Sequence, residues 1–219
     1  MSPLLGEFIG TALLILLGNG VVANVVLDKT KGNNSGWIVI SFGWGMAVFI
    51  GVYAATHLGS PGHINPAFTL ASAYLGSLPW SDVLPYTAAQ MGGAFLGAVL
   101  VWLTYRPHFN ETKDASLQLA VFSTGPAIRN TVANLIAEIM GTITLVLGAL
   151  LMTKSDVKLG TLDALPVALL VLGIGLSLGG PTGYAINPAR DLGPRIAHFV
   201  LPMRGKGKSD WSYAWIPII

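Results

Sequence analysis

The chain has 219 residues, of which 53% are hydrophobic and only 10% are charged, whereas about 25% of the residues of an ordinary soluble domain are charged. This composition is typical of a multi-pass membrane protein, and at roughly 20 residues per span the length allows about six spans with short connections. The net charge of +2 gives no indication of a nucleic acid or an acidic partner, and the absence of cysteine excludes disulfides, thiolate metal sites and cysteine catalysis.

The first half contains three long apolar runs and one interrupted segment. We expect spans over residues 4–27, 37–56 and 82–105, with a polar loop over 28–35. Because the first run lacks a basic flank and a cleavage pattern, we expect it to be a retained span and not a signal peptide. Residues 57–74 are hydrophobic but broken, and the apolar stretch after Pro66 is too short to cross a bilayer alone.

The second half follows the same plan. A long polar connection is expected over residues 106–129, and spans over 132–152 and 165–178 are joined by a short polar loop at 154–163. A second broken segment covers residues 179–200. The last apolar run, 211–219, stops roughly a dozen residues before it could complete a span, so we expect the sixth helix to be truncated in this chain.

Two short motifs indicate that the halves are repeats. Glu7-Phe8-Ile9-Gly10-Thr11 matches Glu138-Ile139-Met140-Gly141-Thr142, and each half later contains Ile-Asn-Pro-Ala. The two Asn-Pro-Ala copies are Asn65-Pro66-Ala67 and Asn187-Pro188-Ala189. In each copy, Asn stands in the N-cap position before a Pro that suits the first turn of a helix. One such triplet is an ordinary turn sequence, but two copies in matching places are hard to reach by chance.

The repeat predicts how the chain lies in the bilayer. Repeat one covers about 1–105 and repeat two about 130–219, within one transmembrane channel domain of residues 1–219. An odd number of spans in each repeat inverts the second repeat, and inverted repeats with broken helices place their site at the repeat interface near the midplane. We therefore expect Asn65 to face Asn187 across a pore. Arg190 follows in an apolar segment, where a cation faces a cavity or a partner.

With these motifs, the sequence resembles the major intrinsic proteins, the family of aquaporins and glycerol facilitators, over nearly its whole length. Asp191 directly after Arg190, and Pro217-Ile218 near the end, look like features of the aquaglyceroporins, such as the bacterial glycerol facilitators. The resemblance implies an all-α membrane protein with six transmembrane helices plus two re-entrant half-helices in an inverted repeat. It also implies a homotetramer in the cell membrane, with both termini in the cytoplasm and no nucleic-acid partner, enzymatic activity, metal or cofactor.

The resemblance also assigns residues to the pore. It implies a selectivity filter made of Trp44, Gly175, Tyr184 and Arg190. Backbone carbonyls lining the pore are expected at Gly62, His63, Gly183, Tyr184 and Ala185, and scaffolding of the broken loops is expected from Glu7, Glu138 and Asp191. Gly175 is expected to leave space opposite the aromatic wall. At Tyr184 the family more usually has Phe, so the extra hydroxyl could narrow the filter or add a polar contact.

The function implied is passive diffusion of glycerol and water, and of small neutral solutes such as urea, with exclusion of ions and protons. One alternative is a mainly water-selective pore; another is a proton-coupled transporter in which Glu7 and Glu138 carry protons. For His63, a ligand or gating role competes with that of a hydrogen-bonded loop residue. The family topology places most Lys and Arg outside, opposite to the usual positive-inside bias.

Overall fold

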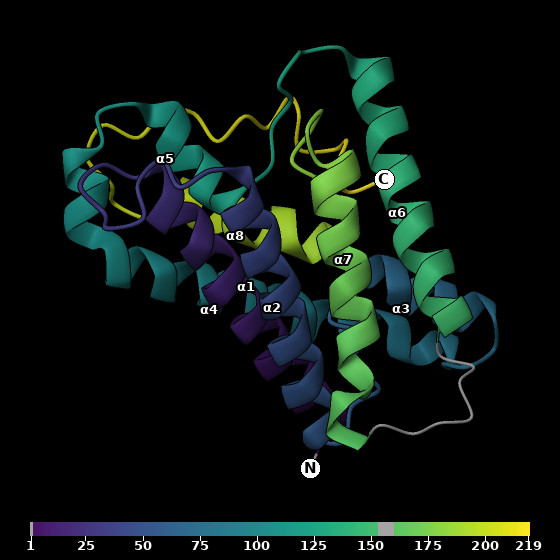
Figure 1. Cartoon of the computed structure of the whole chain (residues 1–219). Coiled ribbons are helices and arrows are strands. Elements are labelled where there is room, and N and C mark those ends of the chain that lie inside the picture. The colour runs from purple at the N-terminus through teal and green to yellow at the C-terminus, as the bar shows by residue number, and fades with distance from the viewer. Residues whose placement is uncertain (1, 153–159) are drawn as a thin grey trace.

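The computed structural model describes residues 2–152 and 160–219, and this part of the chain is helical with no strand. Its elements in chain order are α1 (Pro3–Val26), α2 (Trp37–His57), α3 (Pro66–Tyr74), α4 (Trp80–Glu111), α5 (Ala115–Phe122), α6 (Thr131–Met152), the 3₁₀ helix η1 (Gly160–Ala164), α7 (Leu165–Leu178) and α8 (Pro188–Val200). Figure 1 shows α1 beside α2, α7 next to α2, and α6 beside α7.

Four of the described helices, α1, α2, α4 and α6, are long and apolar enough to cross a membrane. Helix α7 covers the fifth expected span and is short, at 14 residues. The expected sixth run, 211–219, forms successive turns and not a helix, with the Tyr213 amide bonded to the Asp210 carbonyl at 3.1 Å. The loop expected at 154–163 falls largely outside the described residues, and its described end forms η1.

The prediction of a long polar connection over residues 106–129 is wrong in its first part. Helix α4 continues to Glu111, and α5 follows within the same stretch. The end of α4 contacts the loop after α1: Glu111 pairs with Lys29, and the hydroxyl of the C-cap residue Thr112 accepts the Asp28 amide at 2.8 Å. Asp114 then caps α5 by accepting the Ser116 amide at 2.8 Å.

Glycines allow the spans to approach each other closely. A Cβ placed on Gly10 of α1 would lie 2.6 Å from the Gly51 carbonyl oxygen of α2, and one on Gly97 of α4 would lie 2.6 Å from the Ala12 carbonyl oxygen of α1. Real Cβ atoms do not tolerate such distances, so these positions require glycine. Small residues at helix contacts are the usual means by which membrane helices pack.

The two broken segments contain the short helices α3 and α8. Both begin with Pro at the first position after an extended Asn, which has φ −156° at Asn65 and −157° at Asn187. Their lengths of 9 and 13 residues correspond to about 14 and 20 Å, less than the roughly 30 Å of a bilayer core. Neither helix is long enough to cross the bilayer alone, and each begins inside the protein at a buried Asn, as expected for a half-helix.

Candidate functional site

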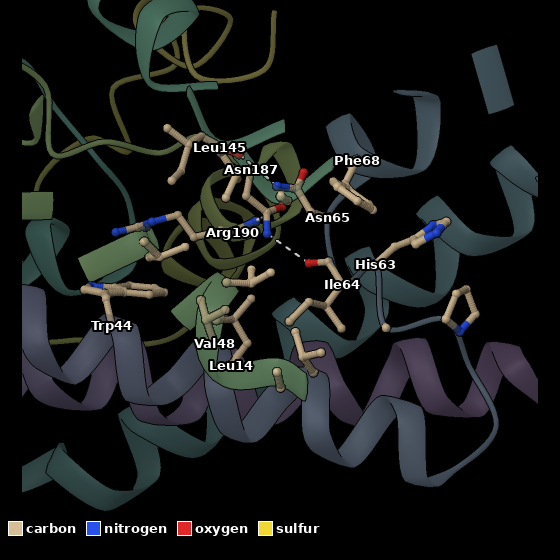
Figure 2. Close-up of a pocket in the computed structure, with 18 of the residues that line it drawn as sticks. Leu14, Trp44, Val48, His63, Ile64, Asn65, Phe68, Leu145, Asn187 and Arg190 are labelled. Carbon is tan, nitrogen blue, oxygen red and sulfur yellow. Dashed lines mark hydrogen bonds between the residues drawn. The ribbon is translucent and has the colours of Figure 1, made fainter. Parts of the chain in front are cut away.

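The two Asn-Pro-Ala motifs meet through reciprocal hydrogen bonds. The Asn65 Nδ2 donates to the Ile186 carbonyl at 2.8 Å, and the Asn187 Nδ2 donates to the Ile64 carbonyl at 2.9 Å (Figure 2). The same side chains cap their own helices, since the Oδ1 atoms accept the amides of Ala67 and Ala189. A carboxamide has two N–H donors, and the described contacts use only one of them in each Asn. The second N–H is available to a solute.

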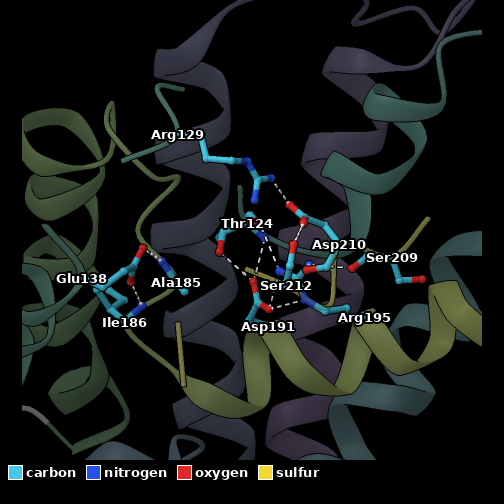
Figure 3. A network of polar contacts seen from close by, with 10 residues as sticks. All are labelled: Thr124, Arg129, Glu138, Ala185, Ile186, Asp191, Arg195, Ser209, Asp210 and Ser212. Atoms are coloured by element: carbon cyan, nitrogen blue, oxygen red, sulfur yellow. Dashed lines mark hydrogen bonds and ion pairs between the residues drawn. The ribbon is translucent and has the colours of Figure 1, made fainter. Parts of the chain in front are cut away.

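Two buried carboxylates hold the loops that precede these motifs. Glu7 of α1 accepts the His63 amide at 2.9 Å and the Ile64 amide at 2.7 Å. Glu138 of α6 accepts the amides of Ala185 and Ile186, both at 3.1 Å (Figure 3). Glu7 also accepts bonds from the Ser60 hydroxyl and the Gln90 amide, and the sequence analysis had not singled out either partner. These contacts suit the scaffolding role.

The loops that the carboxylates hold have unusual backbone geometry. Ile64 has φ +42° and Ile186 has φ +44°, and Tyr184 has φ +41°. A positive φ is rare for a β-branched residue and is maintained only where the surroundings enforce it. Here the amide of each Ile is bound by a glutamate, and its carbonyl is bound by the Asn of the opposite repeat.

A cavity of about 340 Å³ runs past both asparagines. Its apolar wall includes Leu14, Val48, Val52, Leu145 and Val171, and its polar wall includes the expected carbonyl residues Gly62, His63, Tyr184 and Ala185. Gly183, which was also expected to contribute a carbonyl, is not among the lining residues. The cavity thus combines an apolar side with a row of backbone acceptors and two amide donors.

Three of the four expected filter residues lie together beyond the asparagines. The Arg190 guanidinium lies 4.2 Å from the centroid of the Trp44 ring, and both line the cavity with Tyr184. Figure 2 shows Trp44 and Arg190 on one side of the asparagines, with His63 and Phe68 on the other. Gly175 does not line the cavity, and the space expected beside it is filled by Tyr184, whose Oη lies 2.8 Å from where a Gly175 Cβ would be.

Comparison with known proteins now decides the family. The model described as "Major intrinsic protein" matches residues 1–219. The chain belongs to the major intrinsic protein family. The glycerol uptake facilitator protein of Streptococcus pneumoniae is 58% identical over 219 residues, which cover 100% of this chain and 93% of that protein. The glycerol uptake facilitator protein of Bacillus subtilis is 52% identical over 219 residues, covering 100% of this chain and 79% of that protein.

A solved structure agrees with this assignment. The X-ray structure of the aquaglyceroporin from Plasmodium falciparum superposes with a TM-score of 0.84 at 27% identity, covering 99% of this chain and 88% of that chain. The prediction of an all-helical, multi-pass membrane protein of this family is therefore confirmed.

One charged network of this major intrinsic protein was missed by the sequence analysis. Arg195 is fully buried and pairs with Asp191 at 2.8 Å, so Arg190 is not the only cation in α8 (Figure 3). Asp191 accepts the Thr124 amide and hydroxyl, both at 2.7 Å, and Arg195 donates to the Ser209 carbonyl at 2.8 Å. The network ties α8 to the segment after α5 and to the C-terminal segment. The i, i+4 spacing of the opposite charges Asp191 and Arg195 was the feature of the sequence that indicated this pair.

His63 has the surroundings of a hydrogen-bonded loop residue. Its Nδ1 lies 3.2 Å from the Thr69 hydroxyl, and its Nε2 lies 3.3 Å from the Ser72 hydroxyl. The ring also packs between Phe68 and Tyr86, with centroids 5.3 and 5.7 Å away. Among the described residues, no group of His, Cys, Asp and Glu could hold a metal ion, so the contacts favour the loop role over that of a ligand.

The contacts of Glu138 generate a stability prediction. Glu138→Gln replaces one carboxylate oxygen by an NH₂ group that faces a backbone N–H, and a buried N–H without its acceptor costs about 1–3 kcal/mol. We expect a lower unfolding temperature in detergent and reduced solute flux. Glu111→Gln is the matched control, because its ion pair is solvent-exposed and such pairs contribute at most about 1 kcal/mol. Equal unfolding temperatures for the two variants would contradict the scaffolding role.

Proposed function

We propose that this chain forms a passive channel that conducts glycerol and water, and other small neutral solutes such as urea, across the cell membrane and excludes ions and protons. The observation that carries the proposal is the cavity that passes the N-termini of α3 and α8 and then reaches Trp44 and Arg190. Relatives named glycerol uptake facilitator, 52–58% identical over the whole chain, support glycerol as the solute.

The facing helix ends oppose the passage of cations. A helix N-terminus carries roughly +0.5 charge, so α3 and α8 together act on a solute like about one positive charge. At 4 Å and an effective dielectric constant near 20, this repels a monovalent cation by about 4 kcal/mol, or roughly a thousandfold. Dehydration of the ion adds a further barrier. A neutral polyol or water only exchanges hydrogen bonds with Asn65, Asn187 and the loop carbonyls.

The two sides of the cavity fit the two sides of glycerol. Its alkyl edge can lie against the aromatic wall of Trp44 and Tyr184, while its hydroxyls meet the donors of Arg190 and the carbonyls of the loops. The Nη1 of Arg190 is buried and has no hydrogen-bond partner within the described part of the chain, so it is available to a solute. A pore that selects water alone would make little use of the aromatic wall.

A proton-coupled transporter is the alternative from another class. It requires Glu7 or Glu138 to take up and release protons during transport. Each carboxylate accepts two backbone amides of a strained loop, and protonation would remove acceptors that hold the pore together. We therefore favour a structural role for both carboxylates.

Proteoliposomes test the channel proposal directly. Stopped-flow light scattering should show water and glycerol fluxes with low activation energies, no saturation at accessible glycerol concentrations and no response to an imposed pH gradient. Empty liposomes are the control. Flux that saturates and follows the gradient would support the coupled transporter, and water flux without glycerol flux would support the water-selective pore.

Arg190 generates a second prediction for this site. Arg190→Ala should loosen selectivity, because it removes the cation that stacks on Trp44 and leaves room beside the ring; we expect passage of a five-carbon polyol, relative to glycerol, to rise about tenfold. Arg106→Ala is a matched control, since Arg106 also stacks on a tryptophan, Trp102, but is exposed and away from the cavity. Unchanged selectivity in a folded Arg190→Ala variant would move the constriction elsewhere.

We further propose a homotetramer with both termini in the cytoplasm. The outward faces of the spans support assembly or lipid contact, since α6 exposes Val132, Ile136, Ile143, Leu147 and Leu151. Light scattering of the detergent complex measures the number of protomers. Impermeant amine labelling in cells, comparing Lys113 on the expected outer side with Lys154 on the expected inner side, tests the orientation. Labelling of Lys154 alone would reverse it.

A further inference from the structure

The Tyr184 ring is enclosed by two glycines of α7 and its C-terminal end. A Cβ on Gly175 would lie 2.8 Å from both Cζ and Oη of Tyr184, and a Cβ on Gly179 would collide with its Cδ1. The residue is only 5% exposed. The phenol ring therefore lies in a slot formed by the missing side chains of α7, and its open side faces the cavity that it helps to line.

Trp37, in the first turn of α2, closes the slot from another side. Its Nε1 donates to the Gly175 carbonyl at 2.9 Å. Its ring meets Tyr184 edge-on, with centroids 5.9 Å apart and an interplanar angle of 78°. This arrangement is favourable for aromatic pairs. The indole thus binds the helix that forms the slot and also contacts the ring that occupies it.

The Tyr184 hydroxyl lies beside Gly175, which does not line the cavity. Its Oη is buried without a hydrogen-bond partner within the described residues, and so is the Oγ of Ser41 on α2. These two atoms lie 2.8 and 3.1 Å from the same point, the Cβ position of Gly175. Buried hydroxyls are almost always paired, and their position beside the same glycine makes each the available partner of the other.

We propose that Trp37 and Ser41 are positioning residues that set the width of the selectivity filter by holding Tyr184 from behind. The inference rests on the proposed function, because it specifies which residues determine solute size at that site. Trp37 fixes the ring by edge contact and by its bond to α7, and Ser41 takes the hydroxyl. The solute then meets the face of the ring and not its hydroxyl, so Tyr and Phe at residue 184 present the same wall.

Alanine at residue 175 tests the slot. In Gly175→Ala, the new methyl group overlaps Tyr184 and pushes the ring into the cavity. We expect glycerol permeability to fall about tenfold or more, and water permeability to fall less because water is smaller. The matched control is Gly173→Ala on the same helix, where a Cβ meets no heavy atom within 4 Å. Equal glycerol-to-water ratios in the two variants would overturn the proposed slot.

The hydroxyl pair is tested by a double-mutant cycle. Ser41→Ala should change the glycerol-to-water ratio about two- to tenfold, because the orphaned phenol hydroxyl turns to a new partner. Tyr184→Phe keeps the ring and removes only the hydroxyl, so it should change the ratio less than Ser41→Ala does. Ser41→Ala with Tyr184→Phe should return to the ratio of Tyr184→Phe alone. A large effect of Tyr184→Phe alone would place the hydroxyl in the filter and overturn the pairing. A double variant that keeps the altered ratio of Ser41→Ala would also overturn the pairing.

Trp37→Phe keeps an aromatic edge but removes the donor to the Gly175 carbonyl. We expect the preference for glycerol over a five-carbon polyol to fall about two- to tenfold. Trp80→Phe is the control, because Trp80 is 63% exposed and lies outside the cavity. Equal preferences in the two variants would overturn the role of Trp37.

The permeability ratios do not depend on how many channels fold, so a purely structural defect would lower both fluxes and leave the ratios unchanged. Wild-type protein without glycerol flux would refute the proposed function. In that case the double-mutant cycle of Ser41 and Tyr184 would be measured with the permeability ratio of urea to water. Its outcome would test the positioning role of Ser41 independently of glycerol transport.

Discussion

The structure depends on two isoleucines whose backbones are held from both sides. Ile64 and Ile186 adopt positive φ angles of +42° and +44°, which a β-branched residue does not adopt without support. A buried glutamate binds the amide of each, and the asparagine of the opposite repeat binds its carbonyl. The same four polar contacts bring the half-helices end to end, so the strained backbone, the helix caps and the pore centre form one unit.

This arrangement also explains how α8 contains two arginines with different roles. Arg195 pairs with the Asp191 carboxylate and donates hydrogen bonds to carbonyls of the segments that it joins. Arg190 has no such partner for its Nη1 among the described residues and lies on Trp44 instead. A buried cation without a carboxylate is expensive unless a cavity supplies polar contacts. The paired arginine therefore anchors the half-helix, and Arg190 lines the cavity.

The sequence predicted what local pattern and repetition determine. The apolar runs located the spans, and the duplicated Asn-Pro-Ala located the half-helices, because both signals lie within a few neighbouring residues. Prediction from the sequence failed where contacts between residues that are distant in the chain determine the structure. Residues 106–111 continue α4, where His108 and Glu111 contact the loop after α1, and Tyr184 occupies the space beside Gly175. Gln90 was missed because only the fold brings it to Glu7. Arg195 had a local signal, its i, i+4 spacing from Asp191, but its burial and its contacts with other segments depend on the fold.

The two repeats share a backbone plan but differ in the side chains that meet the solute, and this difference separates two tasks. Three residues after each capping asparagine stands Phe68 in the first repeat and Arg190 in the second, and both line the cavity. Three residues before each stands Gly62 or Tyr184, both at positive φ. Both repeats supply a helix N-terminus and an Asn amide. These elements repel cations in the same way, whichever side of the membrane the cation enters from. In the proposed channel, size selection needs a narrow, amphipathic opening only once along the path. Tyr184 and Arg190 of the second repeat supply it together with Trp44 of the first. A second such opening in the first repeat would slow every solute without excluding any further ion.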